Sequence, residues 1–135
     1  NISFRFFNVY GPRQNILGQY SAVFGSFLRQ KRANKPLTIV GDGKQTRDFI
    51  HVEDLTNAFI KAAKSSLVNK IYNLGSGKEI SINKIANLFG GKKTFIPKRP
   101  REPKRSLANI SKIKKDINWK PTITIQEGIK RLLKN

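Results

Sequence analysis

The chain has 135 residues, of which 38% are hydrophobic, and carries a formal charge of +19 from 27 Lys and Arg against 8 Asp and Glu. This size and apolar content suit one domain-sized core and are too small for two. Cys is absent, which excludes disulfides, thiolate metal sites and a thiol nucleophile. No apolar run reaches the roughly 20 residues of a membrane helix. We therefore expect a cytoplasmic protein that contacts no membrane.

The amino-terminal part of the chain is predicted to be a strand, a loop and a helix. Residues 2–9 are rich in β-formers, and Gly11 and Pro12 then begin a loop that reaches to about Tyr20. Residues 21–32 carry an apolar stripe at helical spacing, formed by Val23, Phe24, Phe27 and Leu28. Because Met is absent and the chain opens inside the first apolar run, we expect a piece of a longer protein.

The middle of the chain alternates strands with helices. Residues 37–40 and 70–74 are predicted strands, and residues 51–64 form a helix with acidic residues in its first turn. Ser81 is expected to cap a second helix that ends at Gly90. This alternation predicts an α/β fold.

The carboxyl-terminal part is predicted to hold a short strand, an irregular loop and two helices. Residues 93–96 form the strand, and three prolines then prevent regular structure: Pro97, Pro100 and Pro103. Asn109 is expected to cap a short helix that runs through Lys115. Residues 124–127 read Thr-Ile-Gln-Glu, a capping box that opens the last helix.

The run at residues 41–54, GDGKQTRDFIHVED, is the most informative motif. Gly41 and Gly43 predict a tight turn after a strand, and the alternation that follows Arg47 places Phe49 and Ile50 on opposite faces of the next strand. A guanidinium held there could grip a phosphate through two parallel hydrogen bonds. The alternative is that Arg47 and Asp48 form an ordinary surface ion pair beside a hairpin.

Two further residues are candidates for the same site. Asn8 follows the first strand, where its amide could donate to a ligand oxygen at the carboxyl end of the sheet, although a turn-forming Asn is the alternative. Arg99 lies between prolines that would hold its loop with little entropy to lose on binding, and a solvated charge run is the alternative there.

The basic residues are concentrated in one segment. Ten of them lie in residues 92–115, opposed there only by Glu102. Such a segment attracts nucleotides, acidic surfaces and nucleic acids over long range. A nucleic-acid-binding protein is the less favoured interpretation because no helix-turn-helix, zinc-finger or interleaved aromatic pattern accompanies the charge.

Five motifs together resemble the carboxyl-terminal part of the NAD-dependent sugar-nucleotide epimerases and dehydratases, the extended branch of the short-chain dehydrogenases, of the UDP-glucose 4-epimerase type. In chain order they are RFFNVYGPRQ (5–14), the 41–54 run, YNLGSG (72–77), RPRE (99–102), and SLANISK (106–112) with WKP (119–121). The resemblance implies an α/β substrate-binding part of an extended Rossmann-type, NAD(P)-binding fold with mixed short strands and helices. Residues 1–20 would be the last strands and loop of the cofactor domain, and residues 21–135 the sugar-nucleotide domain.

The resemblance also implies a role for individual residues. Asn8, Arg47 and Arg99 would bind the diphosphate of a nucleotide-sugar, while the backbone of Thr38 and Val40 would bind the edge of the base. Glu102, where the family usually has Asp, would approach the ribose. The implied assignments are substrate binding by Asn8, Thr38, Val40, Arg47, Arg99, Glu102 and Ser106, and cofactor binding by Phe7 near the nicotinamide.

Other positions bear on the sugar and on the loop. Ser106 falls where the family adjusts the room around the second carbon of the sugar, and a small residue there, with residues 20–23, resembles members that accept N-acetylhexosamines. UDP-hexose and UDP-N-acetylhexosamine are therefore both implied ligands. Arg101 stands where the family has Gly, which makes the course of the loop an open question.

The catalytic parts of the family are missing. No Gly-x-x-Gly-x-x-Gly loop seats NAD, and no tyrosine heads a Tyr-x-x-x-Lys pair: Tyr10, Tyr20 and Tyr72 are followed four residues on by Gln14, Phe24 and Ser76. We therefore expect no catalytic residue and no metal in this chain, and we expect the chain alone to be inactive. NAD would be bound mainly by a missing amino-terminal part, and the intact enzyme would be a homodimer. Epimerase and 4,6-dehydratase both remain open, as does a non-enzymatic nucleotide- or polyanion-binding module.

Overall fold

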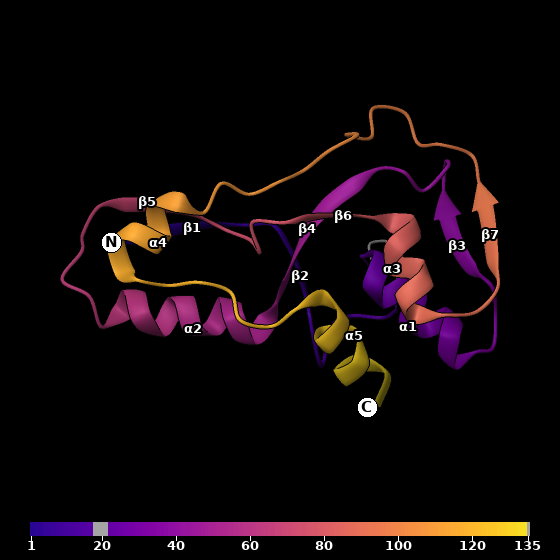
Figure 1. The fold of residues 1–135 in the computed structure, drawn as a ribbon, viewed down its shortest axis with the longest axis horizontal. Coiled ribbons are helices and arrows are strands. Elements are labelled where there is room, and N and C mark those ends of the chain that lie inside the picture. The colour runs from indigo at the N-terminus through magenta and orange to yellow at the C-terminus, as the bar shows by residue number, and fades with distance from the viewer. Residues whose placement is uncertain (18–21, 135) are drawn as a thin grey trace.

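One central strand, β4, joins two groups of elements at opposite ends of an elongated molecule (Figure 1). The computed structural model describes residues 1–17 and 22–134. In chain order the elements are β1 (Ile2–Phe6), β2 (Asn8–Tyr10), α1 (Val23–Arg32), β3 (Leu37–Val40), β4 (Thr46–His51), α2 (Val52–Ala63), β5 (Lys70–Leu74), β6 (Glu79–Ser81), α3 (Ile82–Phe89), β7 (Lys93–Ile96), α4 (Ser111–Ile117) and α5 (Ile125–Lys134). The predicted α/β mixture of short strands and helices is confirmed.

The strands form three small pairings. β1 lies parallel to β5, β3 lies parallel to β7, and β4 lies between parallel β2 and antiparallel β6. Residues 2–9 were expected to form one strand, but the chain changes its partner at Phe7, whose N–H donates to Leu74 O at 2.8 Å. Asn8 then pairs with Phe49 on β4, so the run is divided into β1 and β2.

The described residues bury two hydrophobic clusters, one on each side of β4. Phe49 belongs to the first cluster, with α1, β3 and α3, and Ile50 belongs to the second, with α2, β5 and α4. The buried residues therefore lie on both sides of β4, because successive side chains of a strand point to opposite faces and both faces are covered. That the chain forms one unit stays a prediction. The division of the chain at residue 20 stays a prediction.

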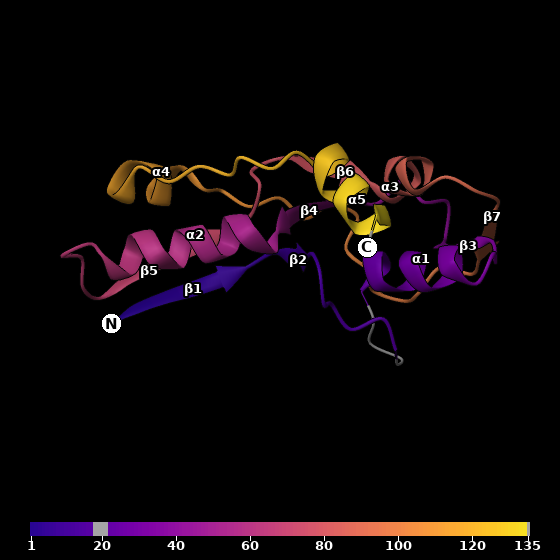
Figure 2. The same ribbon diagram turned by 90° about the horizontal axis from the view of Figure 1, so that it is seen from below.

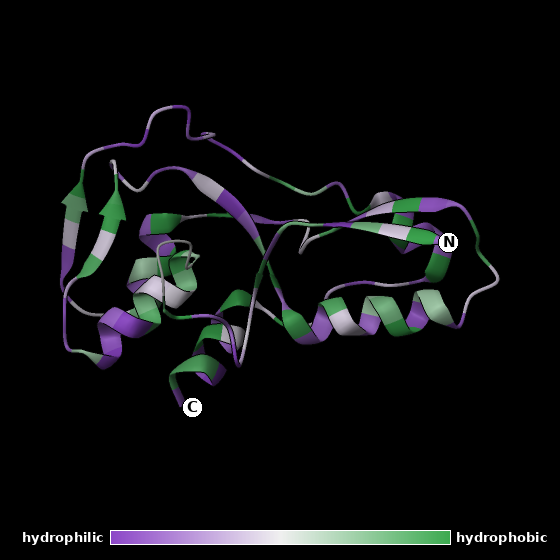
Figure 3. Ribbon diagram, turned by 180° about the vertical axis from the view of Figure 1, so that it is seen from behind, coloured by the Kyte–Doolittle hydropathy of each residue, from purple (hydrophilic) through white to green (hydrophobic). Residues whose placement is uncertain are grey.

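Helix α2 packs with its apolar side toward the second cluster. Apolar and polar residues alternate along it (Figure 3), and β1 and α4 lie on opposite sides of it when the molecule is seen from below (Figure 2). Leu55, Ala58 and Ala62 are buried, whereas Phe59 is 36% exposed and meets the rings of Phe4 and Phe6 at the edge of the cluster. No helix in the described ranges has the length and apolarity needed to cross a bilayer.

The turn and cap signals near the centre of the chain are confirmed. Gly41 and Gly43 have φ of +65° and +71°, the left-handed region that favours glycine. A Cβ at Gly43 would also meet Asn83 and approach Ile39 Cγ2 to 2.8 Å, so this turn requires glycine for space as well. Ser81 Oγ accepts from Lys84 N at 3.2 Å and caps α3, as predicted.

The carboxyl-terminal elements differ from expectation in detail. α4 runs over Ser111–Ile117 with Ile110 at the N-cap, and Asn109 assists by accepting from Ser111 N at 3.0 Å. Thr124 accepts from Glu127 N at 3.2 Å and opens α5, which is one half of the expected capping box. The Glu127 carboxylate instead accepts from Arg131 Nε at 3.0 Å.

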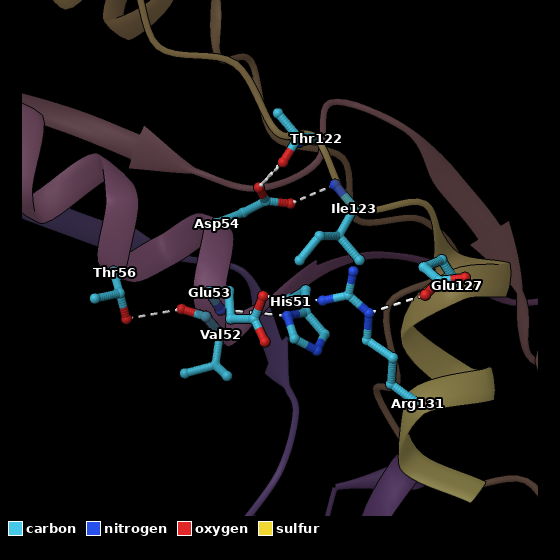
Figure 4. A network of polar contacts seen from close by, with 9 residues as sticks. All are labelled: His51, Val52, Glu53, Asp54, Thr56, Thr122, Ile123, Glu127 and Arg131. Atoms are coloured by element: carbon cyan, nitrogen blue, oxygen red, sulfur yellow. Dashed lines mark hydrogen bonds and ion pairs between the residues drawn. The ribbon is translucent and has the colours of Figure 1, made fainter. Parts of the chain in front are cut away.

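A polar network joins the start of α2 to the segment around α5 (Figure 4). The Asp54 carboxylate accepts from Thr122 N, Thr122 Oγ1 and Ile123 N at 2.8–3.0 Å. His51, 1% exposed, caps α2 by accepting from Glu53 N through Nδ1 at 3.3 Å. Its Nε2 is buried with no partner among the described residues, which makes a charged imidazolium unfavourable there.

The free energy of unfolding is expected to fall when the pH drops below His51's ordinary pKa of 6.5. Burial lowers the pKa of His51, an effect that Arg131 reinforces and that Glu53 and Asp54 oppose. Since the folded state then binds the proton less readily than the unfolded state, this stability is present above pH 6.5 and is lost as the pH falls through the folded-state pKa, by at most about 1.4 kcal/mol per pH unit for one proton.

This pH dependence can be measured by urea unfolding between pH 7.5 and 5. His51 is the single histidine of the chain, so His51→Asn, which keeps a capping side chain, should flatten the profile in that range. A profile of unchanged slope in His51→Asn would contradict the assignment.

Candidate functional site

A cavity of about 550 Å³ lies between α1, the edge of β3, the start of β4 and the loop after β7. This loop, residues 97–110, is called the basic loop below. Six of the seven residues expected to bind substrate line it: Asn8, Thr38, Val40, Arg47, Arg99 and Glu102. An apolar wall completes it, formed by Val23, Phe49, Ile82 and Ile96. A cavity of this size, with an apolar wall facing several converging polar and charged groups, is typical of a small-molecule site.

Arg47 lies at the start of β4 with a side chain that is only 15% exposed. Its guanidinium donates to Thr46 O at 2.8 Å and pairs with Glu102 Oε1 at 3.2 Å. Arg47 is thus a half-buried cation whose counter-ion comes from the basic loop. The guanidinium has five N–H donors, so these two contacts leave capacity for a ligand.

Asp48 is completely buried and holds the loops that surround the site. Its carboxylate accepts from Ser76 N at 2.6 Å, Ser76 Oγ at 2.7 Å, Gly77 N at 2.9 Å and Ala108 N at 3.1 Å. The alternative of an Arg47–Asp48 surface pair is therefore wrong: the two adjacent side chains point to different partners on opposite faces of β4.

Asn8 belongs to strand β2 and not to a turn. Its Nδ2 donates to Asp48 O at 2.8 Å, and the half-buried side chain lines the cavity. One amide hydrogen is therefore used to hold the side chain against β4. Oδ1 and the second hydrogen of Nδ2 are the groups that a ligand can meet.

The free edge of β3 carries the backbone groups of Thr38 and Val40. Leu37 N donates to Lys92 O and Gly41 N to Ile96 O, so the alternate residues between them face away from β7. Thr38 N donates to Gln30 Oε1 at 3.0 Å, and Val40 O accepts from Gln45 Nε2 at 2.9 Å. Between these bonds lie the C=O of Thr38 and the N–H of Val40, for which the described chain supplies no partner.

The basic loop brings Arg99 and Glu102 to the cavity. Arg99 is exposed and has no ion-pair partner in the described ranges. Arg101 has φ of +59°. That is the left-handed region that favours glycine, so Arg101 holds a backbone conformation that L side chains rarely adopt.

The remaining predicted residues lie outside this cavity. Ser106 N donates to Thr46 O at 3.2 Å, which places Ser106 beside the start of β4 without lining the cavity. Phe7 lies at the change of strand partner and packs on the second cluster. Of the 20–23 segment, Tyr20 and Ser21 lie outside the described residues, and Ala22 and Val23 line the cavity.

Sequence reasoning missed three polar cavity residues on α1: Ser26, Arg29 and Gln30. They flank the buried stripe of Phe24, Phe27 and Leu28 at spacings of three and four residues. The same periodicity that predicts the helix could have identified this polar face as the wall of a site.

A second cavity of about 170 Å³ adjoins the first and shares Val40, Gln45 and Glu102 with it. Lys44, Lys98 and Lys104 line it beside the Gly41–Gly43 turn. The combined site is strongly electropositive, because six Lys and Arg side chains line the two cavities against two acidic ones, Asp42 and Glu102. No group of three His, Cys, Asp or Glu that could hold a metal occurs within the described ranges.

The profile of the NAD dependent epimerase/dehydratase family matches residues 1–75. A UDP-glucuronate 4-epimerase of Thermodesulfobacterium geofontis is 37% identical over 134 residues, which are 94% of this chain and 40% of that protein. The chain therefore spans less than half the length of this relative.

Solved structures show the same arrangement of elements. A UDP-glucose 4-epimerase of Thermotoga maritima, solved with UDP-glucose, superposes with a TM-score of 0.92 at 27% identity. The superposed region is 98% of this chain and 44% of the epimerase chain. A UDP-N-acetylglucosamine 4-epimerase of Methanobrevibacter ruminantium, solved with UDP-N-acetylmuramic acid, gives 0.85 at 32% identity over 98% of this chain and 46% of its own.

Proposed function

The chain belongs to the NAD-dependent epimerase/dehydratase family, and on this premise we propose that it is the substrate-binding portion of an NAD-dependent UDP-sugar epimerase. The observation that carries the proposal is the convergence of six expected substrate residues on one cavity. They come from segments as far apart in sequence as Asn8 and Glu102, and residues that served only their local structure would not be expected to line one cavity.

The diphosphate is proposed to lie against Arg47 and Arg99. Both line the cavity, and charge-assisted hydrogen bonds from two sides offset the cost of removing a diphosphate from water. Asn8, already held by β4, donates its second amide hydrogen to the same group.

Glu102 is proposed to exchange partners when the ligand binds. Its carboxylate pairs with Arg47 at 3.2 Å. A diphosphate on Arg47 would repel it, and the ribose hydroxyls offer it hydrogen-bond donors. Glu is one methylene longer than the Asp usual in the family, which gives it the reach for both positions.

The base is proposed to bind the open pair on β3. The C=O of Thr38 accepts from a ring N–H, and the N–H of Val40 donates to the neighbouring carbonyl oxygen of the base. The apolar wall of the cavity excludes water from these two bonds.

The proposed reaction needs a cofactor that other parts of the enzyme hold. NAD supplies reversible removal of a hydride from the fourth carbon of the sugar in such an enzyme, and only Phe7 of this chain is proposed to lie near it. No tyrosine of the chain heads a Tyr-x-x-x-Lys pair, so we propose that the chain alone does not catalyse. The sugar is proposed to be a hexose or an N-acetylhexosamine, with Ser106 as the small residue near its second carbon.

Titration of UDP, uridine and inorganic pyrophosphate into the chain tests the proposal. UDP is expected to bind at least tenfold more tightly than uridine, since each charge-assisted bond to the diphosphate contributes about 1.5 to 3 kcal/mol. Pyrophosphate is expected to compete with UDP.

The charge of +19 supports a second candidate, a polyanion- or nucleic-acid-binding module. Duplex DNA titrated at rising salt is the matching measurement. Steeply salt-dependent DNA binding, with no response to UDP, would favour that candidate and overturn the proposed function.

A further inference from the structure

Gln30 forms two hydrogen bonds with one residue at the free edge of β3. Its Oε1 accepts from Thr38 N at 3.0 Å, and its Nε2 donates to Thr38 Oγ1 at 2.9 Å. Both residues are half-buried and line the larger cavity. A carboxamide nitrogen carries two hydrogens, and the second one on Gln30 Nε2 has no partner in the described part of the chain.

This second hydrogen extends the pattern of the strand edge. From Gln30 along β3, the unsatisfied groups are an N–H of Gln30, the C=O of Thr38 and the N–H of Val40, because Gln30 and Gln45 occupy the outer backbone groups. The edge therefore offers a donor, an acceptor and a donor in that order. Uracil and thymine present the complementary acceptor (O4), donor (N3–H) and acceptor (O2). Cytosine, read from the same end, presents a donor (the 4-amino group), an acceptor (N3) and an acceptor (O2).

We propose that Gln30 is a specificity-determining residue that favours uracil or thymine over cytosine by donating its second Nε2 hydrogen to O4 of the base, where cytosine has an amino group. The inference rests on the proposed function, since it requires a nucleotide in this cavity. A site that hydrogen-bonds a polar group discriminates against an analogue that lacks it, because its own groups are then left unpaired.

The position of Gln30 separates this role from a merely structural one. Helix α1 is held on the first cluster by Phe24, Phe27 and Leu28, each no more than 5% exposed, and not by Gln30. Loss of the Gln30 side chain should therefore leave the helix packed and change the ligand preference.

Titration of UDP, dTDP and CDP into the unaltered chain, Gln30→Leu and Gln30→Glu is the test. The unaltered chain should bind UDP about tenfold more tightly than CDP, and both variants should lose about tenfold in UDP affinity without a loss in CDP affinity. Gln30→Glu keeps an acceptor for Thr38 N and lacks the donor, so it carries the test if Gln30→Leu does not fold. Gln126→Leu, an exposed glutamine on α5, is the matched control and should behave as the unaltered chain.

The outcomes separate this inference from the proposed function. An unchanged UDP-to-CDP ratio in both variants, with UDP still bound, overturns the role of Gln30 alone. No binding of UDP to the unaltered chain overturns the proposed function and the role of Gln30 with it. If dTDP follows UDP through the series, the base edge is the feature recognised; if only UDP responds, the ribose or the missing methyl group determines the preference and the inference is overturned.

Discussion

Arg47→Ala is expected to weaken UDP binding at least tenfold. The side chain is 15% exposed at the start of β4 and lines the cavity beside Arg99. A hydrogen bond to a charged group contributes about 1.5 to 3 kcal/mol, and the planar guanidinium can form two of them with one phosphate. Arg47→Lys should recover only part of the affinity, because an ammonium keeps the charge without the paired geometry.

The control has to separate this contact from the long-range attraction of a chain with charge +19. Arg32→Ala removes the same charge from the exposed end of α1, outside the cavity, and should change the affinity for UDP little at physiological salt. Equal losses in Arg47→Ala and Arg32→Ala would mean that UDP responds only to net charge.

Glu102→Gln completes the series because it removes the anion that competes for Arg47. Pyrophosphate, which has no ribose, should bind this variant more tightly than the unaltered chain. UDP should gain less or lose affinity, since the proposed ribose contact is weakened as well: an amide oxygen is a weaker acceptor than a carboxylate. Isothermal titration calorimetry with both ligands measures this difference directly.

The elements that were predicted correctly are those whose signals are local. The turn at Gly41 and Gly43, the Ser81 cap and the start of α5 at Thr124 each depend on residues within a few positions along the chain. Such signals act before any tertiary contact exists, so a sequence displays them in full.

What was not predicted depends on distant partners. The break at Phe7 and the second hydrophobic cluster follow from which strands pair with β2 and β4, and no local pattern specifies that choice. The same holds for Gln30, whose contact with Thr38 depends on how α1 packs on β3.

The cavity itself was predicted through family resemblance and not through local chemistry. Six of the residues that the motifs single out line it, including Arg99 in a loop without regular structure. The resemblance contains no information on α1 beyond residue 23, so the polar face of that helix was missed.

Asp48→Ala is expected to lower the free energy of unfolding by about 3 to 5 kcal/mol, because each buried donor that loses its partner costs about 1 to 3 kcal/mol. The carboxylate is fully buried and accepts four hydrogen bonds, from donors 28 to 60 residues away in sequence. Its removal leaves those donors unpaired in an interior where each unsatisfied group is costly.

The comparison variant is Asp42→Ala, which removes an exposed carboxylate that accepts one bond from Lys44 N at 3.0 Å. Because that group faces water, its loss should cost less than about 1 kcal/mol. Urea unfolding followed by circular dichroism measures both variants. The whole free energy of unfolding of such a domain is only about 5 to 15 kcal/mol. The loops at residues 76–77 and 108 are bonded to Asp48 on β4, the strand that carries Arg47. Asp48→Ala should therefore also lose UDP affinity as the temperature rises. An Asp48→Ala midpoint equal to that of Asp42→Ala would show that the four donors find other partners and that the position of Arg47 does not depend on them.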